Sequence, residues 1–464
     1  MNATTETVAS AGLSKSLRSR HITMISIGGI IGAGLFVGSS AAIATVGPAV
    51  IVSYVLAGLV VLMVMRMLSE MAVARPGVQS FPEFARLGLG EWAGFICGWL
   101  YWYFWIVVVT IEAIAGAIIV DKWFPGFEVW QIAAVLMALL TGTNLLSARA
   151  FGEFEFWFSS ITVAAIIVFL LVAAAFAFGL AGGEGMRFAN LTSHGGFAPN
   201  GWGAVFAAVT TVVFSMIGAE IATVAAIEAE DPGRTVARLS SILAVRILLF
   251  YILSVLLIVI VAPWTVVVPG FSPFTSALEV MNIPGAGFLM DVVVLVAVLS
   301  CLNSGLYVTS RVLFTLAARG HAPQALVKLG RREVPVRAIL FGAFFSYLAL
   351  GVSIVSPDTA FGFLVNASGA LMLFVYLLIA AAQLRLRPQL EREAPGGLKV
   401  KMWLHPWGSL FSIAGMIGVL VAMAVTPDLA SQFTASLLIV LLAAGSFLLL
   451  RLLRRPNPRG PEEG

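Results

Sequence analysis

Two carboxylate residues lie beside long uncharged runs and are the side chains best placed to do chemistry. Glu112 follows the run Trp92–Ile111, and Glu220 follows the run Gly195–Ala219. A carboxylate at the centre of a lipid bilayer costs about 2.5–3.5 kcal/mol, so it persists there only with a partner or a role. Each is a candidate for proton or ion coupling, or for contact with a ligand amine. The alternatives are a position near the membrane surface for Glu112 and a cap on an unwound segment for Glu220.

Backbone groups offer a second kind of ligand where glycines interrupt the apolar runs. Gly28, Gly29, Gly32 and Gly34 lie close together, and each costs a continuous helix about 1 kcal/mol relative to Ala. An unwound segment there would expose amides and carbonyls, whereas close helix packing is the alternative explanation. The stretch Phe214–Glu220 repeats the pattern, with a glycine and an acid inside an apolar run.

Breaks in the first and sixth spans are what an inverted repeat of five plus five helices produces. The N-terminus of a half-helix carries partial positive charge and favours a carboxylate. The C-terminus of a half-helix and the free carbonyls beside it favour an ammonium group. This pair of dipoles predicts a small zwitterion of the amino-acid type as the ligand of a transporter.

Further polar residues inside apolar runs are candidates to line a pathway. They are Asn303 and Ser304 in one predicted span, and Asn366 and Ser368 in another. Hydrogen bonds between helices that only stabilise packing explain these residues equally well.

The composition indicates what holds these groups in place. Of the 464 residues, 60% are hydrophobic and 11% charged, against about 25% charged in an ordinary soluble domain. The mean hydropathy is +1.01. Such a chain is expected to be a polytopic membrane protein in contact with the lipid bilayer, which excludes a soluble enzyme, a nucleic-acid-binding protein and a secreted scaffold.

Uncharged runs predict an all-α membrane protein with twelve transmembrane helices. The run Ile22–Met65 would be about 66 Å long as a helix, against a hydrocarbon core of about 30 Å, so it forms two spans. Gly47-Pro48 is the expected break between them. A β-barrel is excluded because the runs lack alternation of period two. The ten further runs are Trp92–Ile111, Val129–Ala148, Phe156–Gly183, Gly195–Ala219, Ile247–Leu278, Val292–Ser310, Ala338–Pro357, Thr359–Leu384, Pro406–Pro427 and Leu429–Leu450.

The positions of the basic residues predict the orientation. With both termini in the cytoplasm, all but two of the 27 Lys and Arg residues fall on the inner side, and the two exceptions are Lys122 and Arg187. Residues 1–21 and 454–464 are then cytoplasmic tails. The two cysteines and four scattered histidines predict neither a disulfide framework nor a metal site, and no cofactor is expected.

Several stretches resemble the amino-acid permease family of the amino acid–polyamine–organocation superfamily. The narrower resemblance is to bacterial γ-aminobutyrate (GABA) permeases. The stretches span nearly the whole chain; they are SRHITMISIGGIIGAGLFVGSS (Ser19–Ser40), GWLYWYFWIVVVTIEAIAGA (Gly98–Ala117), FGEFEFWF (Phe151–Phe158), FSMIGAEIATVAA (Phe214–Ala226) and SCLNSGLYVTSR (Ser300–Arg311).

This resemblance implies a leucine-transporter-type fold: a first five-helix repeat over residues 22–180, an inverted second repeat over 200–386, and two additional helices over 387–453. It implies uptake of an amino acid across the bacterial inner membrane, usually coupled to protons. Matching the family's motifs places the ligand on two backbone segments. These are Ile30, Gly32, Ala33 and Gly34 in span one, and Phe214, Ser215, Met216, Ile217 and Gly218 in span six.

One departure from the family leaves the coupling ion open. Many relatives have a lysine, tied to proton coupling, at the position of Thr162. A hydroxyl cannot replace a bound cation, so the proton uses Glu112 or Glu220, or sodium returns to this position, or transport is exchange. The substrate alternatives are GABA or a related short zwitterion, and an α-amino acid such as proline, alanine or an aromatic residue.

Overall fold

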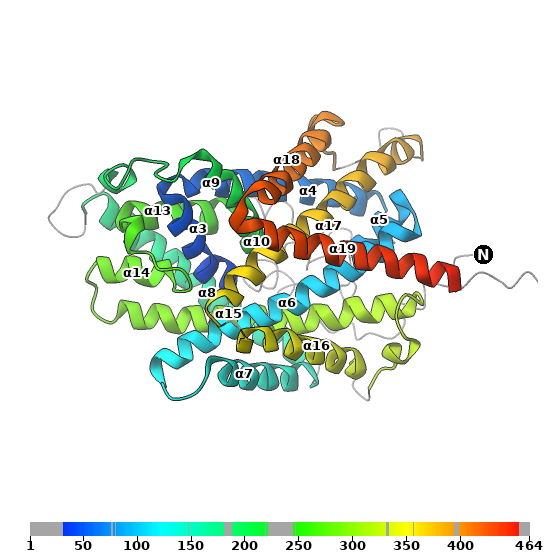
Figure 1. Cartoon of the computed structure of the whole chain (residues 1–464), viewed down its shortest axis with the longest axis horizontal. Helices are drawn as coiled ribbons and strands as arrows, with labels where there is room; N and C mark the ends of the chain where they lie inside the picture. Colours follow the sequence, from blue (N-terminus) through cyan, green and yellow to red (C-terminus); the bar gives the residue numbers. More distant parts are fainter. Residues whose placement is uncertain are drawn as a thin grey trace, which may run out of the picture.

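A computed structural model gives the structure of the chain. It describes residues 31–75, 78, 80–146, 148–180, 188–218, 220, 245, 247–330, 334–355, 357–393, 398 and 400–453. The described part is a bundle of α-helices without strands (Figure 1). Its main elements are a π-helical turn η1 (Gly34–Gly38), α3 (Ser39–Val46), α4 (Val50–Ala74), α5 (Phe81–Leu89), α6 (Glu91–Trp123), α7 (Val129–Asn144), α8 (Ala148–Ala177), α9 (Gly201–Ala207), α10 (Val209–Met216), π-helical η5 (Ile247–Leu253), α13 (Ser254–Val261), α14 (Pro273–Val280), α15 (Ala286–Ala318), α16 (Val336–Val355), α17 (Pro357–Glu393), α18 (Trp407–Val425) and α19 (Pro427–Leu453).

Within the described residues, seven helical segments are long and apolar enough to cross a membrane, and four shorter apolar helices accompany them. Each uncharged run of the sequence contains at least one of these helices. The chain is therefore a multi-pass membrane protein of the all-α class.

Two boundaries follow from residues that a helix tolerates poorly. At Gly47 the chain has φ 75°, a conformation that favours glycine, and Pro48 follows in a short 3₁₀ turn. The chain turns here between α3 and α4 (Figure 1). The run Ile247–Leu278, predicted as one span, is helical only to Val261. Beyond it the chain forms only the short 3₁₀ turn η6 (Trp264–Val266) before α14, because Pro263 and Pro269 interrupt a continuous helix; Pro273 is the first residue of α14.

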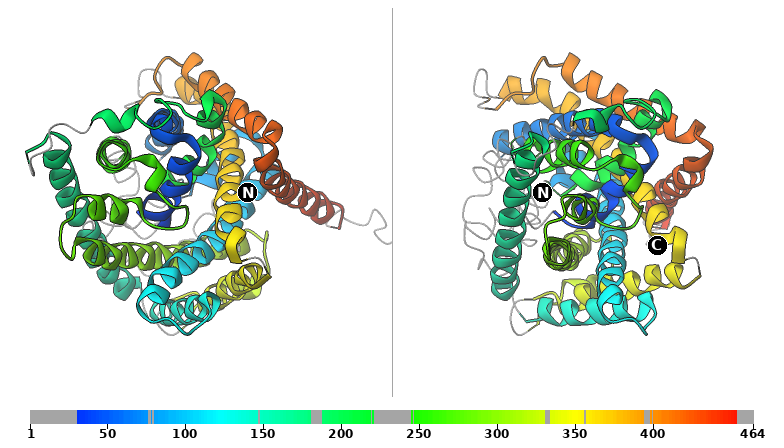
Figure 2. Two further views of the ribbon diagram at one scale, coloured as in Figure 1. Left: turned by 60° about the vertical axis from the view of Figure 1, so that its left-hand side comes forward. Right: turned by 90° about the vertical axis from the view of Figure 1, so that its left-hand side faces the viewer.

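The long helices α6 and α15 form the centre of the bundle, where they cross and pack against each other (Figure 1). The most apolar part of α6 is 83% buried, whereas that of α19 is only 11% buried. Figure 2 shows α18 and α19 at the edge of the bundle. Sites built on α6 and α15 are therefore inside the protein, while α19 is available to lipid.

Helix α8 buries one stripe and exposes the other faces. Phe151, Glu155, Ser159, Thr162 and Ile166 are fully or almost fully buried, and their spacing of three or four residues places them on one face. The neighbouring Trp157 and Ile161 are exposed. The buried stripe of α8 contains three polar side chains, which lie between helices and away from lipid.

Candidate functional site

The break predicted in span one lies at the edge of the described residues. Ile31 and Gly32 are not helical, and a helix begins at Ala33 and continues as η1. The amides of Leu35 and Phe36 bond to the Gly32 carbonyl at 3.2 Å. Ile30, predicted to contact the ligand, lies outside the described part of the chain.

The side chain of Glu112 binds the first amide of this half-helix. Ala33 N–H donates to the two carboxylate oxygens of Glu112, with N–O distances of 2.8 and 3.1 Å. Glu112 lies on α6 and is buried, and the thiol of Cys301 on α15 lies beside its carboxyl group. The unwound backbone thus already binds one carboxylate, in the geometry of a helix N-terminus.

Glycines are required here for close approach as well as for the break. A Cβ on Gly32 would lie 2.5 Å from a carboxylate oxygen of Glu112 and 2.6 Å from Cβ of Cys301. A Cβ on Gly34 would lie 2.7 Å from Cα of Ser215. Gly32 and Gly34 therefore allow close packing against α6, α15 and α10, and Gly32 also lies in non-helical backbone. Gly28 and Gly29 lie outside the described residues.

The structure describes the start of the break predicted in span six, as far as Gly218, and also Glu220. Helix α10 ends at Met216, Ile217 is extended with ψ 153°, and Gly218 has φ 118°. The Glu220 carboxylate accepts hydrogen bonds from Gly218 N–H at 3.1 and 3.2 Å, and from the Tyr376 hydroxyl of α17 at 3.3 Å. Glu220 therefore caps the unwound segment, which is one of the two roles predicted for it.

Residues at the two predicted breaks border one small cavity. This arrangement brings the start of the first half-helix against the end of α10, so a partly positive end and a partly negative end lie side by side. Of the predicted ligand residues that the structure describes, four line this cavity and four do not; those that do not are Gly32, Ala33, Met216 and Gly218. The sulfur of Met216 lies near Gly58 of α4. The cavity is lined by Gly34, Phe104, Trp105, Val108, Glu112, Phe214, Ser215, Ile217 and Cys301.

Phe104 and Trp105 line the cavity, and the sequence analysis did not single them out. Both are almost fully buried. They precede Glu112 by about two helical turns, and Val108 by one, so all four lie along one face of α6. That spacing was the signal available in the sequence.

The polar residues predicted to line a pathway lie outside this cavity. Asn303 accepts from Asn144 of α7 at 2.7 Å, and Asn366 accepts from Thr211 of α10 at 2.5 Å. Ser368 bonds to a carbonyl of its own helix at 2.6 Å. Buried amides and hydroxyls need such partners in an apolar interior, and this placement favours the alternative of hydrogen bonds that stabilise packing.

Thr162 is buried, and its hydroxyl donates to the Phe158 carbonyl one turn earlier at 3.0 Å. It does not line the cavity between the breaks. Thr162 lies on the buried stripe of α8, about one turn after Ser159. Glu155 lies on the same stripe, one turn before Ser159, and the sequence analysis did not single it out.

Glu155 is fully buried between α8 and α15. Its two carboxylate oxygens accept from the Asn303 amide at 2.9 Å and from the Ser300 hydroxyl at 2.7 Å, and Ser304 lies beside the same carboxyl group. The signal that could have identified Glu155 is its spacing: it shares a helical face with Ser159 and Thr162.

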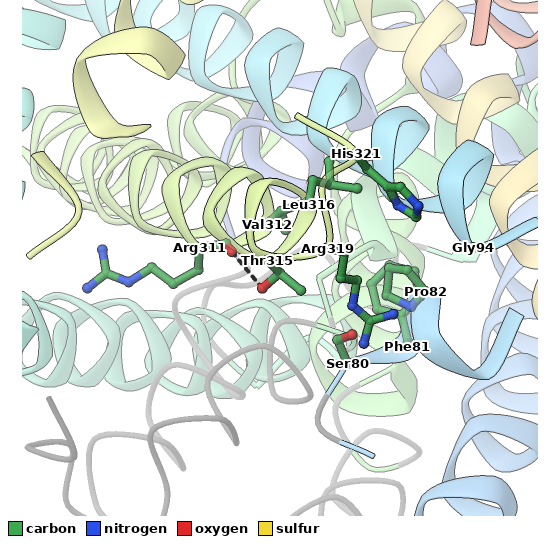
Figure 3. Close-up of a pocket in the computed structure, with 11 residues that line it drawn as sticks. Ser80, Phe81, Pro82, Gly94, Arg311, Val312, Thr315, Leu316, Arg319 and His321 are labelled. Atoms are coloured by element: carbon green, nitrogen blue, oxygen red, sulfur yellow. Dashed lines mark hydrogen bonds between the residues drawn. The ribbon is translucent and has the colours of Figure 1, made fainter. Parts of the chain in front are cut away.

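A larger hollow lies away from both predicted breaks, at the start of α5 and the C-terminal end of α15 (Figure 3). Arg319 and His321 contribute to its wall, together with Phe81 of α5. The Arg319 guanidinium forms an ion pair with Glu83, and the Arg311 carbonyl accepts from the Thr315 hydroxyl at 2.9 Å. Two of its charged side chains thus have partners outside the hollow: Arg319 pairs with Glu83, and the Arg311 guanidinium lies over the Tyr307 ring.

Comparison with known proteins agrees with this architecture. The amino acid permease family model matches residues 21–454. The chain belongs to the amino acid permease family. The earlier resemblance is therefore confirmed, and this permease is a transporter and not an enzyme.

Individual relatives within the family match this permease over most of its length. This permease is 47% identical to the γ-aminobutyric acid permease of Bacillus subtilis over 442 residues, covering 95% of this chain and 94% of the relative. It is 44% identical to the γ-aminobutyric acid permease of Escherichia coli over 419 residues, covering 89% of each. The aromatic amino acid transport protein AroP of Corynebacterium glutamicum is 38% identical over 417 residues, covering 89% of this chain and 90% of the relative.

Proposed function

We propose that this permease imports γ-aminobutyrate, or a closely related short zwitterion, together with protons. The observation that carries the proposal is the hydrogen bond between the Ala33 amide and the Glu112 carboxylate. A backbone amide at a helix break that holds an internal carboxylate is suited to hold the carboxylate of a ligand. Relatives whose names specify γ-aminobutyric acid, at 44–47% identity, support the choice of ligand.

The amine of the ligand then lies toward the end of α10. The last carbonyls of a helix have no partners within it and carry partial negative charge. Phe214 and Ser215 lie in the last turn of this helix and line the cavity, with Ile217 and Gly218 following in non-helical conformations. The Phe214 carbonyl accepts from Ile217 N–H at 3.3 Å, and the Ser215 carbonyl is one of those at the end of the helix. On the other side, Gly32, Ala33 and Gly34 present the amide end. Phe214 and Trp105 cover the apolar methylenes between the two charged groups.

Proton coupling follows from competition for one amide. Ionised Glu112 occupies the Ala33 N–H that the ligand carboxylate requires, and the two negative charges repel each other. When Glu112 binds a proton it loses its charge and becomes a weaker acceptor, so the ligand carboxylate can replace it. Proton binding and ligand binding therefore favour each other, which is the condition for symport.

We place the site in a leucine-transporter-type architecture of twelve spans. Repeats over residues 22–180 and 200–386, followed by two helices over 387–453, account for breaks in spans one and six. The basic residues favour cytoplasmic tails at 1–21 and 454–464 in the bacterial inner membrane. Helices within every predicted run support this arrangement.

Two alternatives rest on specific observations. The aromatic lining by Phe104, Trp105 and Phe214, with the AroP relative, favours an α-amino acid, aromatic ones included, as an alternative substrate. Thr162, in place of the lysine of many relatives, favours sodium coupling or exchange as the alternative to proton symport.

Uptake by the purified permease in proteoliposomes tests these assignments. Labelled γ-aminobutyrate is offered under an inside-alkaline pH gradient, a sodium gradient, or neither, with unlabelled proline, alanine or phenylalanine as competitors. We expect uptake that the pH gradient drives, that a protonophore abolishes and that the α-amino acids compete for poorly. Uptake that ignores the protonophore and follows sodium contradicts the proton assignment, and strong competition by phenylalanine contradicts the substrate.

A further inference from the structure

Glu155 is a buried carboxylate on α8 to which the transport scheme above gives no role. Its exposed fraction is 0%. The described part of the chain contains no ion pair to it. An ionised carboxylate without a cation in a low-dielectric interior is costly, even where neutral donors surround it. Such a group is stable where it can also exist as the neutral acid.

The amide network around Glu155 has only one consistent orientation. Asn144 donates to the Leu140 carbonyl at 3.0 Å, and a carbonyl can only accept, so this nitrogen is identified. The same nitrogen donates to Oδ1 of Asn303 at 2.7 Å. The amide nitrogen of Asn303 must therefore face Glu155, to which it donates at 2.9 Å. One carboxyl oxygen of Glu155 is thereby a permanent acceptor.

The second carboxyl oxygen has a partner that can reverse its role. It lies 2.7 Å from the Ser300 hydroxyl. A hydroxyl donates one hydrogen bond and accepts others, so Ser300 donates to the ionised carboxylate and accepts from the protonated acid. Glu155 can therefore gain or lose a proton without any change in the positions of its neighbours.

The position of Glu155 beside α15 brings it close to the cavity between the predicted helix breaks. Cys301 lines that cavity, beside Glu112. Ser300 and Asn303, on the same turn of α15, hold Glu155. Arg311 lines the larger hollow, about 15 Å further along α15 from Cys301 at about 1.5 Å rise per residue. Glu155 is thus held by the turn of α15 that borders the transport cavity, and the larger hollow lies further along the same helix.

The elements packed against α8 present few other titratable groups to Glu155. Within the described residues, α7 and α13 contain none, and Glu279 of α14 lies beside Gly287 near the start of α15. On α15, the ring of Tyr307 stacks on Phe151 at 4.2 Å. The guanidinium of Arg311 covers the far side of the stack, 3.9 Å from the Tyr307 ring.

We propose that Glu155 is a second proton-binding carboxyl of the permease, which receives the coupled proton from the Glu112 cavity and passes it toward the hollow at the ends of α5 and α15. The inference rests on the proposed proton-coupled import. Glu112 links the proton to the ligand, whereas Glu155 carries the proton and does not touch the ligand. Removing the titratable group from Glu155 therefore uncouples transport without weakening ligand binding.

The test compares two transport modes of the same reconstituted full-length protein. Counterflow of labelled against unlabelled γ-aminobutyrate requires the carrier but no net proton movement. Accumulation under a pH gradient of one unit requires coupling, and one proton per ligand permits about tenfold accumulation. We expect Glu155→Gln to retain counterflow with an unchanged KM and to lose nearly all of the pH-driven accumulation. Ser300→Ala, which removes the hydroxyl that reverses its role, should shift the pH dependence of accumulation and preserve counterflow.

Glu153→Gln is the matched control, because Glu153 lies two residues earlier on α8 and is only partly buried. It should retain both modes. If Glu155→Gln still accumulates ligand as the wild type does, or loses counterflow as well, Glu155 is not a proton carrier and its role is structural. Accumulation driven by sodium in the wild type and lost in Glu155→Gln would instead make it a sodium ligand. Wild-type protein without counterflow of γ-aminobutyrate refutes the proposed substrate and not this residue's role.

Discussion

Replacing Gly34 by Ala tests whether close contact between the two helix breaks makes the site. The added Cβ would lie 2.7 Å from Cα of Ser215, 3.1 Å from its Cβ and 3.3 Å from the Phe214 ring. The nearest atom belongs to the backbone of α10, so it cannot turn aside as the end of a flexible side chain would. Overpacking of this kind typically costs about 1–3 kcal/mol.

This strain must be relieved by moving η1 away from α10, which separates the amide end of the site from the carbonyl end. If the whole cost falls on ligand binding, KM for γ-aminobutyrate rises about 5- to 150-fold. Initial rates of labelled uptake in proteoliposomes, normalised to monodisperse protein recovered by size-exclusion chromatography, measure this change.

Gly38→Ala is the control for Gly34→Ala, because both glycines lie in η1 about one turn apart. A Cβ on Gly38 would lie 3.5 Å from the Ala33 carbonyl oxygen, which is an ordinary contact. Both substitutions gain the same helix propensity, about 1 kcal/mol, so a difference between them reports the contact with α10. Wild-type KM in Gly34→Ala, or equal damage in Gly38→Ala, would refute the reasoning.

Three further predictions concern titratable groups. Glu112→Gln cannot ionise, so we expect the affinity for γ-aminobutyrate to become independent of pH, as measured by equilibrium binding to the detergent-solubilised protein. Glu220→Ala leaves the Gly218 amide without its acceptor, and thermal unfolding should show a loss of about 1–3 kcal/mol. Burial and the charge of Arg387 lower the pKa of His405 from its ordinary 6.5, so the unfolded chain binds a proton before the folded protein does as the pH falls. The folded state should lose stability as the pH falls below about 6.5. In His405→Gln, thermal unfolding measured across this range should lack the part of the stability loss that His405 causes.

The helical runs could be predicted from local sequence, and so could the non-helical backbone at Gly32 and after Met216. Uncharged runs identify membrane helices because an unpaired charge in hydrocarbon is costly. Clustered glycines identify breaks because they weaken a helix. The run Ile247–Leu278 was wrongly predicted as one continuous span. That prediction considered only the absence of charged residues and ignored the prolines at 263, 269 and 273.

The partners of the polar residues could not be predicted in the same way. Asn303 was a candidate for the pathway, but in the structure it orients Glu155 and accepts from Asn144. Its surroundings are contributed by three helices, and their relative rotation depends on packing across the whole bundle. Glu155 was missed for the same reason, since its neighbours in sequence are aromatic and another glutamate.

By itself, the sequence determined that this chain is a multi-pass membrane bundle of helices, with helix-weakening glycines at Gly32 and Gly218. Hydrophobic runs and helix-weakening residues act locally, so they can be recognised without a fold. Only the tertiary structure decided that Ala33 and Glu112, 79 residues apart, form one hydrogen-bonded site. It also decided that Glu155 is bound by Ser300 and Asn303 of α15. Those contacts depend on how α6, α8 and α15 pack, and a hydrogen bond exists only when packing brings donor and acceptor within about 3 Å.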